Sequence, residues 1–196
     1  MDHFGDIAFT PSVQDHQRRR GSIDAYQQMA QGTAPNGLGP DEAAFLEERD
    51  SFYLATVGSG GWPYVQHRGG PIGFLRVLEP TRLAWVERAG NRQFVTAGNL
   101  DDDDRVALIA VDYPTRRRLK LLGRARWDPD PGRDLRDALG ATGRLEGLVT
   151  VDIAAFDWNC PKYITPRYTL EQVRELTAAL VARITELEGQ LAPLTD

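Results

Sequence analysis

The sequence has few of the residues that build disulfide-linked or metal-centred folds. It contains one cysteine, Cys160, and three histidines, His3, His16 and His67. A single thiol excludes an intrachain disulfide, and the scattered histidines lack the spacing of a structural zinc site. We therefore expect no metal.

Long hydrophobic runs are also missing. No stretch approaches the roughly 18 apolar residues that a membrane-spanning helix needs, and the first residues, MDHFGDIAFTPSVQ, lack the basic-then-apolar order of a secretory signal. The net charge of -5 argues against a protein that coats nucleic acid, although local basic clusters can still bind a small anion. We expect a soluble cytoplasmic protein with neither membrane nor nucleic acid as a partner.

The middle of the chain consists of short strand patterns. They cover residues 51–57, 62–67, 73–79, 82–88, 105–113, 118–127 and 148–153. The turn Gly58–Gly61 joins the first two into a predicted hairpin. The runs SFYLATV and RVALIAV are apolar on both alternating faces, which favours a closed or partly closed barrel. The predicted fold class is mainly β with flanking helices (α+β), built on an antiparallel barrel.

In the strand pattern over 118–127, alternation separates two faces. Leu119, Leu121, Ala125 and Trp127 point one way, whereas Lys120, Arg124 and Arg126 point the other way. One face of this strand should therefore be packed, and the other should face solvent or a ligand.

Helical patterns lie at both ends of the chain, over residues 11–31, 41–49 and 169–191. We expect an N-terminal helical cover over residues 1–50, a barrel domain over 51–165, and a C-terminal helix over 166–196 that belongs to the same domain. The last helix carries an apolar stripe, which has to be covered by its own barrel or by a second subunit. Its members are Leu170, Val173, Leu176, Leu180, Ile184, Leu187 and Leu191.

The segment GNRQFVTAGNL, residues 90–100, follows a predicted strand and reads as the start of a helix. Asn91 is a favourable N-cap, with Arg92 and Gln93 in the first turn. Free backbone N–H groups and a forked Arg donor there suit a phosphate. The alternative is an ordinary capped helix with a solvated Arg.

Two further basic clusters lie at strand ends. Gln66, His67 and Arg68 close a strand and precede Gly69-Gly70-Pro71, where glycines permit close approach of a ligand; the alternative is a simple bend with a surface charge. His67 is more consistent with a groove-lining or structural role than with a catalytic base. The run 116–118, three arginines followed by Lys120, is either a third anion-binding element or a solvated hairpin tip.

The order of these pieces resembles the pyridoxamine 5′-phosphate oxidase-like family of FMN-binding split barrels, over roughly Phe52 to Trp127. It runs WPYVQHRGG, RLAWVERAGNRQFVTAGNL, RVALIAVDY and RRRLKLLGRARW. The resemblance implies an FMN groove between two subunits of a homodimer. It implies that Arg68 and the triplet Asn91, Arg92 and Gln93 bind the FMN phosphate, and that Arg117 and Arg118 reach it from the partner chain.

Two departures from the family pattern affect the expected activity. Gly69-Gly70-Pro71 replaces the basic residue that follows the strand-end Arg in pyridoxamine phosphate oxidases, and the C-terminal Arg-x-His motif is absent. Residues 156–164, FDWNCPKYI, resemble instead the flavin-nucleotide-binding branch, which makes Trp158 and Asn159 candidates to line the flavin ring. The alternative is a core Trp followed by a turn. Cys160 lacks a pairing typical of a reactive thiol.

We therefore expect an FMN-dependent oxidoreductase that transfers a hydride or electrons, with NAD(P)H as a possible reductant and with no catalytic acid or base assigned. Two alternatives keep the fold: a deazaflavin-dependent reductase, and a non-catalytic flavin- or haem-binding module.

Overall fold

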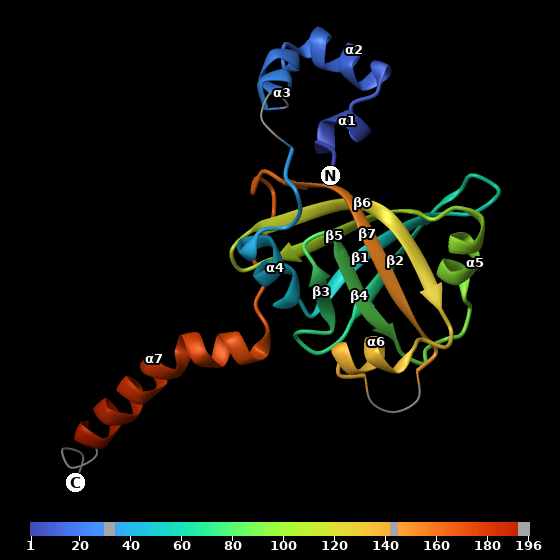
Figure 1. Cartoon of the computed structure of the whole chain (residues 1–196). Helices are drawn as coiled ribbons and strands as arrows, with labels where there is room; N and C mark the ends of the chain where they lie inside the picture. The colour runs from blue at the N-terminus through green and yellow to red at the C-terminus, as the bar shows by residue number, and fades with distance from the viewer. Residues whose placement is uncertain (30–33, 142–144, 192–196) are drawn as a thin grey trace. The chain divides into compact units, whose positions relative to one another are not determined.

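The structure is a computed structural model that describes residues 1–29, 34–141 and 145–191. The chain divides into two compact units. One comprises residues 1–111 with 117–160, and the other comprises 112–116 with 161–196. The first unit holds the barrel (Figure 1).

The described residues form seven strands in one antiparallel sheet, in the order β2-β1-β5-β6-β7-β4-β3. The strands are β1 (Ser51–Val57), β2 (Pro63–Gly69), β3 (Leu75–Glu79), β4 (Arg82–Glu87), β5 (Arg105–Asp112), β6 (Arg117–Asp128) and β7 (Gly147–Trp158). Each matches a predicted run, so the mainly-β split-barrel prediction is confirmed. The largest difference is in β7, which continues five residues beyond the predicted end because it pairs with β6 as far as Trp158 opposite Leu119.

The helices are α1 (Phe4–Ala8), α2 (Pro11–Arg20), α3 (Ile23–Met29), α4 (Pro40–Glu47), α5 (Val95–Asp102), α6 (Arg133–Ala138) and α7 (Leu170–Leu191). The single helix predicted over residues 11–31 is instead α2 and α3, and residues 30 and 31 lie outside the described residues. Gly21 ends α2 because it adopts a left-handed conformation, with φ 70°, that returns its N–H to Arg18 O. The short helices α1 and α6 were not predicted.

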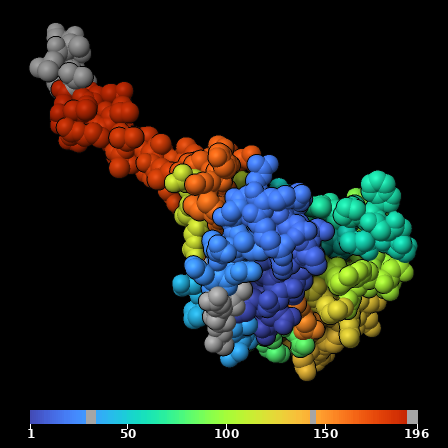
Figure 2. Space-filling view, turned by 90° about the horizontal axis from the view of Figure 1, so that it is seen from above, coloured from blue at the N-terminus to red at the C-terminus, as the bar shows by residue number. Residues whose placement is uncertain are grey.

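The N-terminal helices lie over one end of the barrel, as Figure 2 shows in blue. The Asp2 N–H donates to Ala154 O of β7 at 2.9 Å, and Lys120 of β6 lies 4.4 Å from the ring of Phe4. These contacts tie α1 to the β6–β7 pair.

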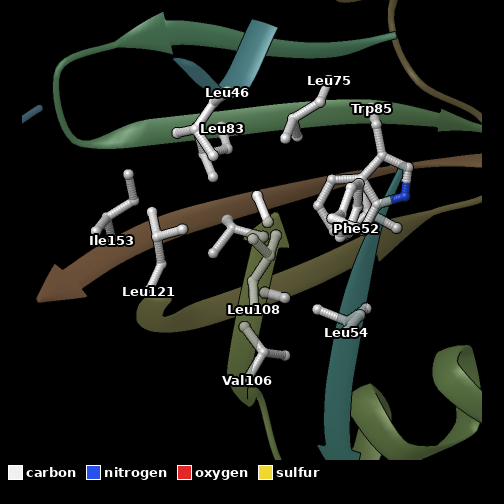
Figure 3. Packing of buried hydrophobic residues seen from close by; sticks show 14 of the residues in the cluster. Leu46, Phe52, Leu54, Leu75, Leu83, Trp85, Val106, Leu108, Leu121 and Ile153 are labelled. Carbon is white, nitrogen blue, oxygen red and sulfur yellow. The ribbon is translucent and has the colours of Figure 1, made fainter. Parts of the chain in front are cut away.

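The barrel interior is a single apolar cluster, shown in Figure 3. Phe52 of β1 contacts the ring of Trp85 of β4 edge-on, with the ring centroids 5.0 Å apart. Leu46 of α4 is fully buried in the same cluster. Burying each such side chain contributes about 1.5–3 kcal/mol relative to leaving it exposed.

The two faces of β1 differ more than the apolar pattern suggested. Phe52, Leu54 and Thr56 point into the barrel and are buried, whereas Tyr53 between them is 40% exposed. In β6 the predicted alternation is confirmed, since Leu119 and Leu121 are buried while Arg124 is exposed. Packing in the barrel core therefore does not explain why the outer face of β1 carries partly exposed apolar residues.

The barrel is split between β2 and β4, which lie near opposite ends of the strand order. The strands at the two ends of this order are β2 and β3. Phe52 of β1 contacts Trp85 of β4, and Arg68 of β2 forms an ion pair with Glu87 of β4, so the two ends of the sheet approach each other through β4, the neighbour of β3. We call the line between β2 and β4 the seam.

The second unit contains α7 and the turn between β5 and β6. α7 begins with a reciprocal cap, in which Gln172 N–H donates to Thr169 Oγ1 and Thr169 N–H donates to Gln172 Oε1. The Arg167 guanidinium lies 4.9 Å from the Tyr113 ring. The predicted helix is confirmed over residues 170–191, while the covering of its apolar stripe stays a prediction.

Candidate functional site

A cavity of about 250 Å³ opens at the seam, where the end of β2, the loop after β4 and the start of α5 meet. Its lining residues are Gln66, Arg68, Glu87, Arg88, Gly90, Asn91, Arg92, Gln93, Phe94, Val95, Thr96, Ala97, Trp127 and Glu146. Two of the three basic clusters predicted from the sequence therefore meet at one place.

Arg68 is the most buried of the three arginines that line this cavity. Its side chain is 14% exposed, and its Nη2 donates to Thr96 Oγ1 at 2.9 Å. Its Nε lies 3.0 Å from Glu87 Oε1, as an ion pair. Nevertheless Nε is buried, and no acceptor among the described residues is aligned with it for a hydrogen bond. Thr96 and Glu87 thus hold the Arg68 guanidinium in one orientation at the cavity wall, and a forked guanidinium group is suited to an anion.

The strand alternation explains why Gln66 and Arg68 both face the cavity. Gln66 Oε1 accepts from Thr96 Oγ1 at 3.3 Å and from the Tyr64 hydroxyl at 3.1 Å. Thr96 is itself 5% exposed and lies in the first turn of α5. These side chains connect β2 to α5 across the cavity wall.

The loop before α5 differs from the predicted capped helix. Asn91 is not the N-cap: its Oδ1 accepts from the Gln93 N–H at 3.2 Å, and the helix begins only at Val95. Arg92 and Phe94 have left-handed backbones, with φ of 57° and 51°. An Asn that bonds the backbone two residues on favours a turn over a helix, which explains the later start. The prediction that Arg92 and Gln93 fill the first helical turn is therefore wrong, although both line the cavity.

The charges of the cavity nearly balance. Arg92 is 60% exposed, its Nε lies 3.7 Å from Glu146 Oε1, and its guanidinium lies 5.8 Å from the Phe94 ring. Arg68, Arg88 and Arg92 stand against two carboxylates, those of Glu87 and Glu146. The first backbone N–H groups of α5, which lack partners within the helix, add partial positive charge to the same wall.

His67 and Gly69 do not line this cavity. His67 points to the outer face of the sheet, where its ring lies edge-on to Tyr53 with centroids 5.6 Å apart. At the neighbouring Gly70, an added Cβ would lie 2.6 Å from Phe74 Cγ. The glycine pair therefore leaves room for a protein side chain, and nothing in this arrangement supports the close ligand approach expected from the sequence.

Arg117 and Trp158 lie in another cluster. The Arg117 guanidinium lies 4.4 Å from the Trp158 ring, which meets the Phe45 ring edge-on at 4.7 Å. Trp158 Nε1 donates to Glu42 Oε1 of α4 at 2.7 Å. Within this chain the Trp158 indole is thus engaged by protein groups.

Arg118 and Asn159 are joined by their backbones, since the Asn159 N–H donates to Arg118 O at 3.1 Å. The Arg118 Nε is buried, with no hydrogen-bond acceptor in the described part of the chain. Asn159 and the exposed Cys160 line a crevice beneath α1. The cavity at the seam contains none of the residues predicted to act from a partner chain.

Sequence reasoning missed several lining residues. Glu87 ends β4 and Arg88 follows it, and both read as ordinary strand positions in the sequence, where Trp127 belongs to the packed face of its strand. Among these missed residues, only Thr96 has a sequence feature that could have indicated the site, because it is a hydroxyl residue near the start of a predicted helix. Glu146 has no local pattern that points to a site.

Residues 1–29, 34–141 and 145–191 contain no cluster of three or more His, Cys, Asp or Glu side chains arranged to hold a metal ion. In the same ranges, no helix combines the length and the apolar character required to cross a membrane.

The fold and the cavity together define a split-barrel protein with an arginine-lined site suited to a phosphate group. Residues 38–142 match the family model described as pyridoxamine 5′-phosphate oxidase, and the chain belongs to that family. The resemblance noted from the sequence is thereby confirmed. A search of the curated proteins finds no significant match.

Several solved structures are similar to this chain. HupZ from Group A Streptococcus is similar with a TM-score of 0.50 at 14% identity, covering 67% of this chain and 100% of that one. A Lactobacillus delbrueckii protein, whose assignment as a pyridoxamine 5′-phosphate oxidase is provisional, has a TM-score of 0.49 at 25% identity, covering 63% and 95%. An FMN-binding protein from Syntrophomonas wolfei has a TM-score of 0.46 at 11% identity, covering 74% and 96%.

Proposed function

We propose that this protein binds FMN by its phosphate in the seam cavity and acts as an FMN-dependent oxidoreductase. The observation that carries the proposal is that Arg68, whose side chain is 14% exposed, and Arg92 line one cavity. A phosphate oxygen is the acceptor that such a guanidinium group favours.

The surrounding groups fit the same ligand. Arg92 also lines the cavity, in a left-handed loop, as do the residues of the first turn of α5. The first N–H groups of a helix have no partner within the helix and favour an anion. Phe94 and Trp127, whose rings lie edge-on 6.2 Å apart, add an aromatic wall beside the charged groups. A ligand with a phosphate at one end and a flat aromatic system at the other matches this division.

We propose further that the site is completed in a homodimer. The outer face of β2, β1 and β5 presents Val65, 61% exposed, and Tyr53, which lies between His67 and Ile109 in the sheet register. An exposed apolar sheet face of this kind is typical of a subunit interface. In such a dimer the family resemblance assigns Arg117 and Arg118 to the phosphate of the partner's flavin, which accounts for their absence from the lining of this chain's own cavity. Trp158 and Asn159 are proposed to line the flavin ring.

When bound, FMN supplies the hydride or electron transfer. The residues of the chain bind and orient it: Arg68 and Arg92 hold the phosphate, and Thr96 and Glu87 fix the direction of the Arg68 guanidinium. NAD(P)H is the proposed reductant.

The test is the absorbance spectrum of the freshly purified protein, followed by mass analysis of any small molecule released on denaturation. We expect flavin absorbance, release of FMN and bleaching on addition of NAD(P)H. A Soret band or a released deazaflavin would overturn the proposal of FMN. Flavin absorbance that NAD(P)H does not bleach would reject the oxidoreductase activity with this reductant and leave a binding module.

A further inference from the structure

The carboxylates of the seam cavity are oriented toward its arginines. Glu87 Oε1 lies 3.0 Å from Arg68 Nε, and Glu146 Oε1 lies 3.7 Å from Arg92 Nε. The two glutamate side chains are 18% and 16% exposed, so solvent screens them only in part.

Glu87 is held in place from the core side. Its Oε1 also accepts a hydrogen bond of 2.7 Å from Nε1 of Trp85, an indole that is 1% exposed. A buried indole N–H without an acceptor would be costly, so this bond resists rotation of the carboxylate away from the cavity. An anion that binds Arg68 must therefore sit beside a negative charge that stays in place.

We propose that Glu87, assisted by Glu146, is a resident counter-ion that competes with the ligand phosphate for Arg68 and Arg92 and keeps the bound molecule exchangeable. This inference rests on the proposed phosphate site and adds to it a residue that sets affinity. Removing the negative charge of Glu87, while keeping its acceptor for Trp85, should strengthen binding. A residue whose only role was to orient Arg68 would have the opposite effect.

Glu87→Gln makes this change, because the amide oxygen still accepts from the indole while the charge is lost. We expect the dissociation constant for FMN to fall about tenfold, mainly through slower release. Riboflavin, which has the same ring without the phosphate, should bind both proteins equally. Glu146→Gln should tighten FMN two- to threefold, because its pair is longer and Arg92 is more exposed.

Glu79→Gln is the matched control. Glu79 at the end of β3 pairs with Arg82 and is not among the residues of the seam cavity. Its substitution therefore makes the same change of net charge at a place away from the cavity. Its FMN affinity should stay within twofold of the wild type. Equal tightening in this control would overturn the inference in favour of a general charge effect.

Weaker or unchanged FMN binding by folded Glu87→Gln would also overturn the inference and leave Glu87 as an orienting residue. If Glu87→Gln fails to fold by circular dichroism, Glu146→Gln decides by the same criterion. Inorganic phosphate, followed by titration with 31P NMR, separates this inference from the proposed function. If neither the wild type nor Glu87→Gln binds FMN, but Glu87→Gln binds phosphate more tightly than the wild type, FMN is rejected as the ligand and Glu87 is supported as a counter-ion. If neither binds FMN and the two phosphate titrations are the same, the proposed function and this inference are both rejected.

Discussion

Replacing Arg68 by Lys tests the phosphate site most directly, because it keeps the positive charge and removes the fork. The guanidinium now spans Thr96 Oγ1 at 2.9 Å and Glu87 Oε1 at 3.0 Å while it lines the cavity. A single ammonium cannot serve these partners and a phosphate oxygen with the same geometry. Losing one hydrogen bond to a charged group costs about 1.5–3 kcal/mol, which corresponds to an FMN affinity about 10- to 150-fold weaker.

Titration of the apoprotein with FMN, followed by quenching of flavin fluorescence, measures this loss. Riboflavin should lose far less affinity, since the substitution acts on the phosphate. Arg76→Lys on β3 is the control: Arg76 pairs with Glu47 and does not line the seam cavity, so its FMN affinity should not change. An FMN dissociation constant for Arg68→Lys within twofold of the wild type would refute the assignment of Arg68.

Three further predictions concern the barrel, its outer face and its response to acid. Gly70→Ala should destabilise the fold by about 1–3 kcal/mol, seen as a lower melting temperature, because the new Cβ would lie 2.6 Å from Phe74 Cγ. Tyr53→Lys should convert a dimer to a monomer in light scattering, because it places a charge on the proposed interface; a persistent dimer would move the interface elsewhere. Hydrogen bonds from Arg105 hold the pKa of Asp103 well below its usual range, so its stabilising contribution is present above about pH 4 and is lost on acidification. The melting temperature of Asp103→Asn should therefore fall less than that of the wild type when the pH is lowered below about 4. An equal fall in both proteins would contradict this prediction.

A matched control exists for Gly70→Ala. Gly98 lies inside α5, and a Cβ added there meets nothing within 4 Å. Gly98→Ala should leave the melting temperature unchanged or raise it, because alanine favours the helix. A similar loss in both variants would point to a general effect of removing glycine and not to the contact with Phe74.

The strands were predictable because their signal is local. Alternation along RLKLLGRARW follows from the two-residue period of a strand, and Leu119 and Leu121 are buried as that period requires. SFYLATV is apolar on both faces, so its sequence did not show that Phe52 and Leu54 point inward. The start of α5 was not predictable from the same kind of reasoning. The Asn91 side chain bonds a backbone N–H two residues on, and this competing turn moves the helix start to Val95.

The candidate site divides in the same way. Arg68 and Arg92 could be chosen from the sequence, because each lies beside a strand end or a helix start and carries the donor chemistry of a phosphate site. Glu87 and Glu146 could not, because the charge that they oppose comes from residues far away in the chain.

The sequence by itself determined the strands and the long C-terminal helix, the packed face of β6 and the identity of the main cations, since these depend on neighbouring residues and on side-chain chemistry. Only the tertiary structure decided that β2 and β4 meet at a seam, that Arg68 is oriented there by Thr96 and Glu87, and that Trp158 is engaged by Glu42. Such contacts depend on how the sheet curves to bury its apolar face, and the curvature is set by the packing of the whole core.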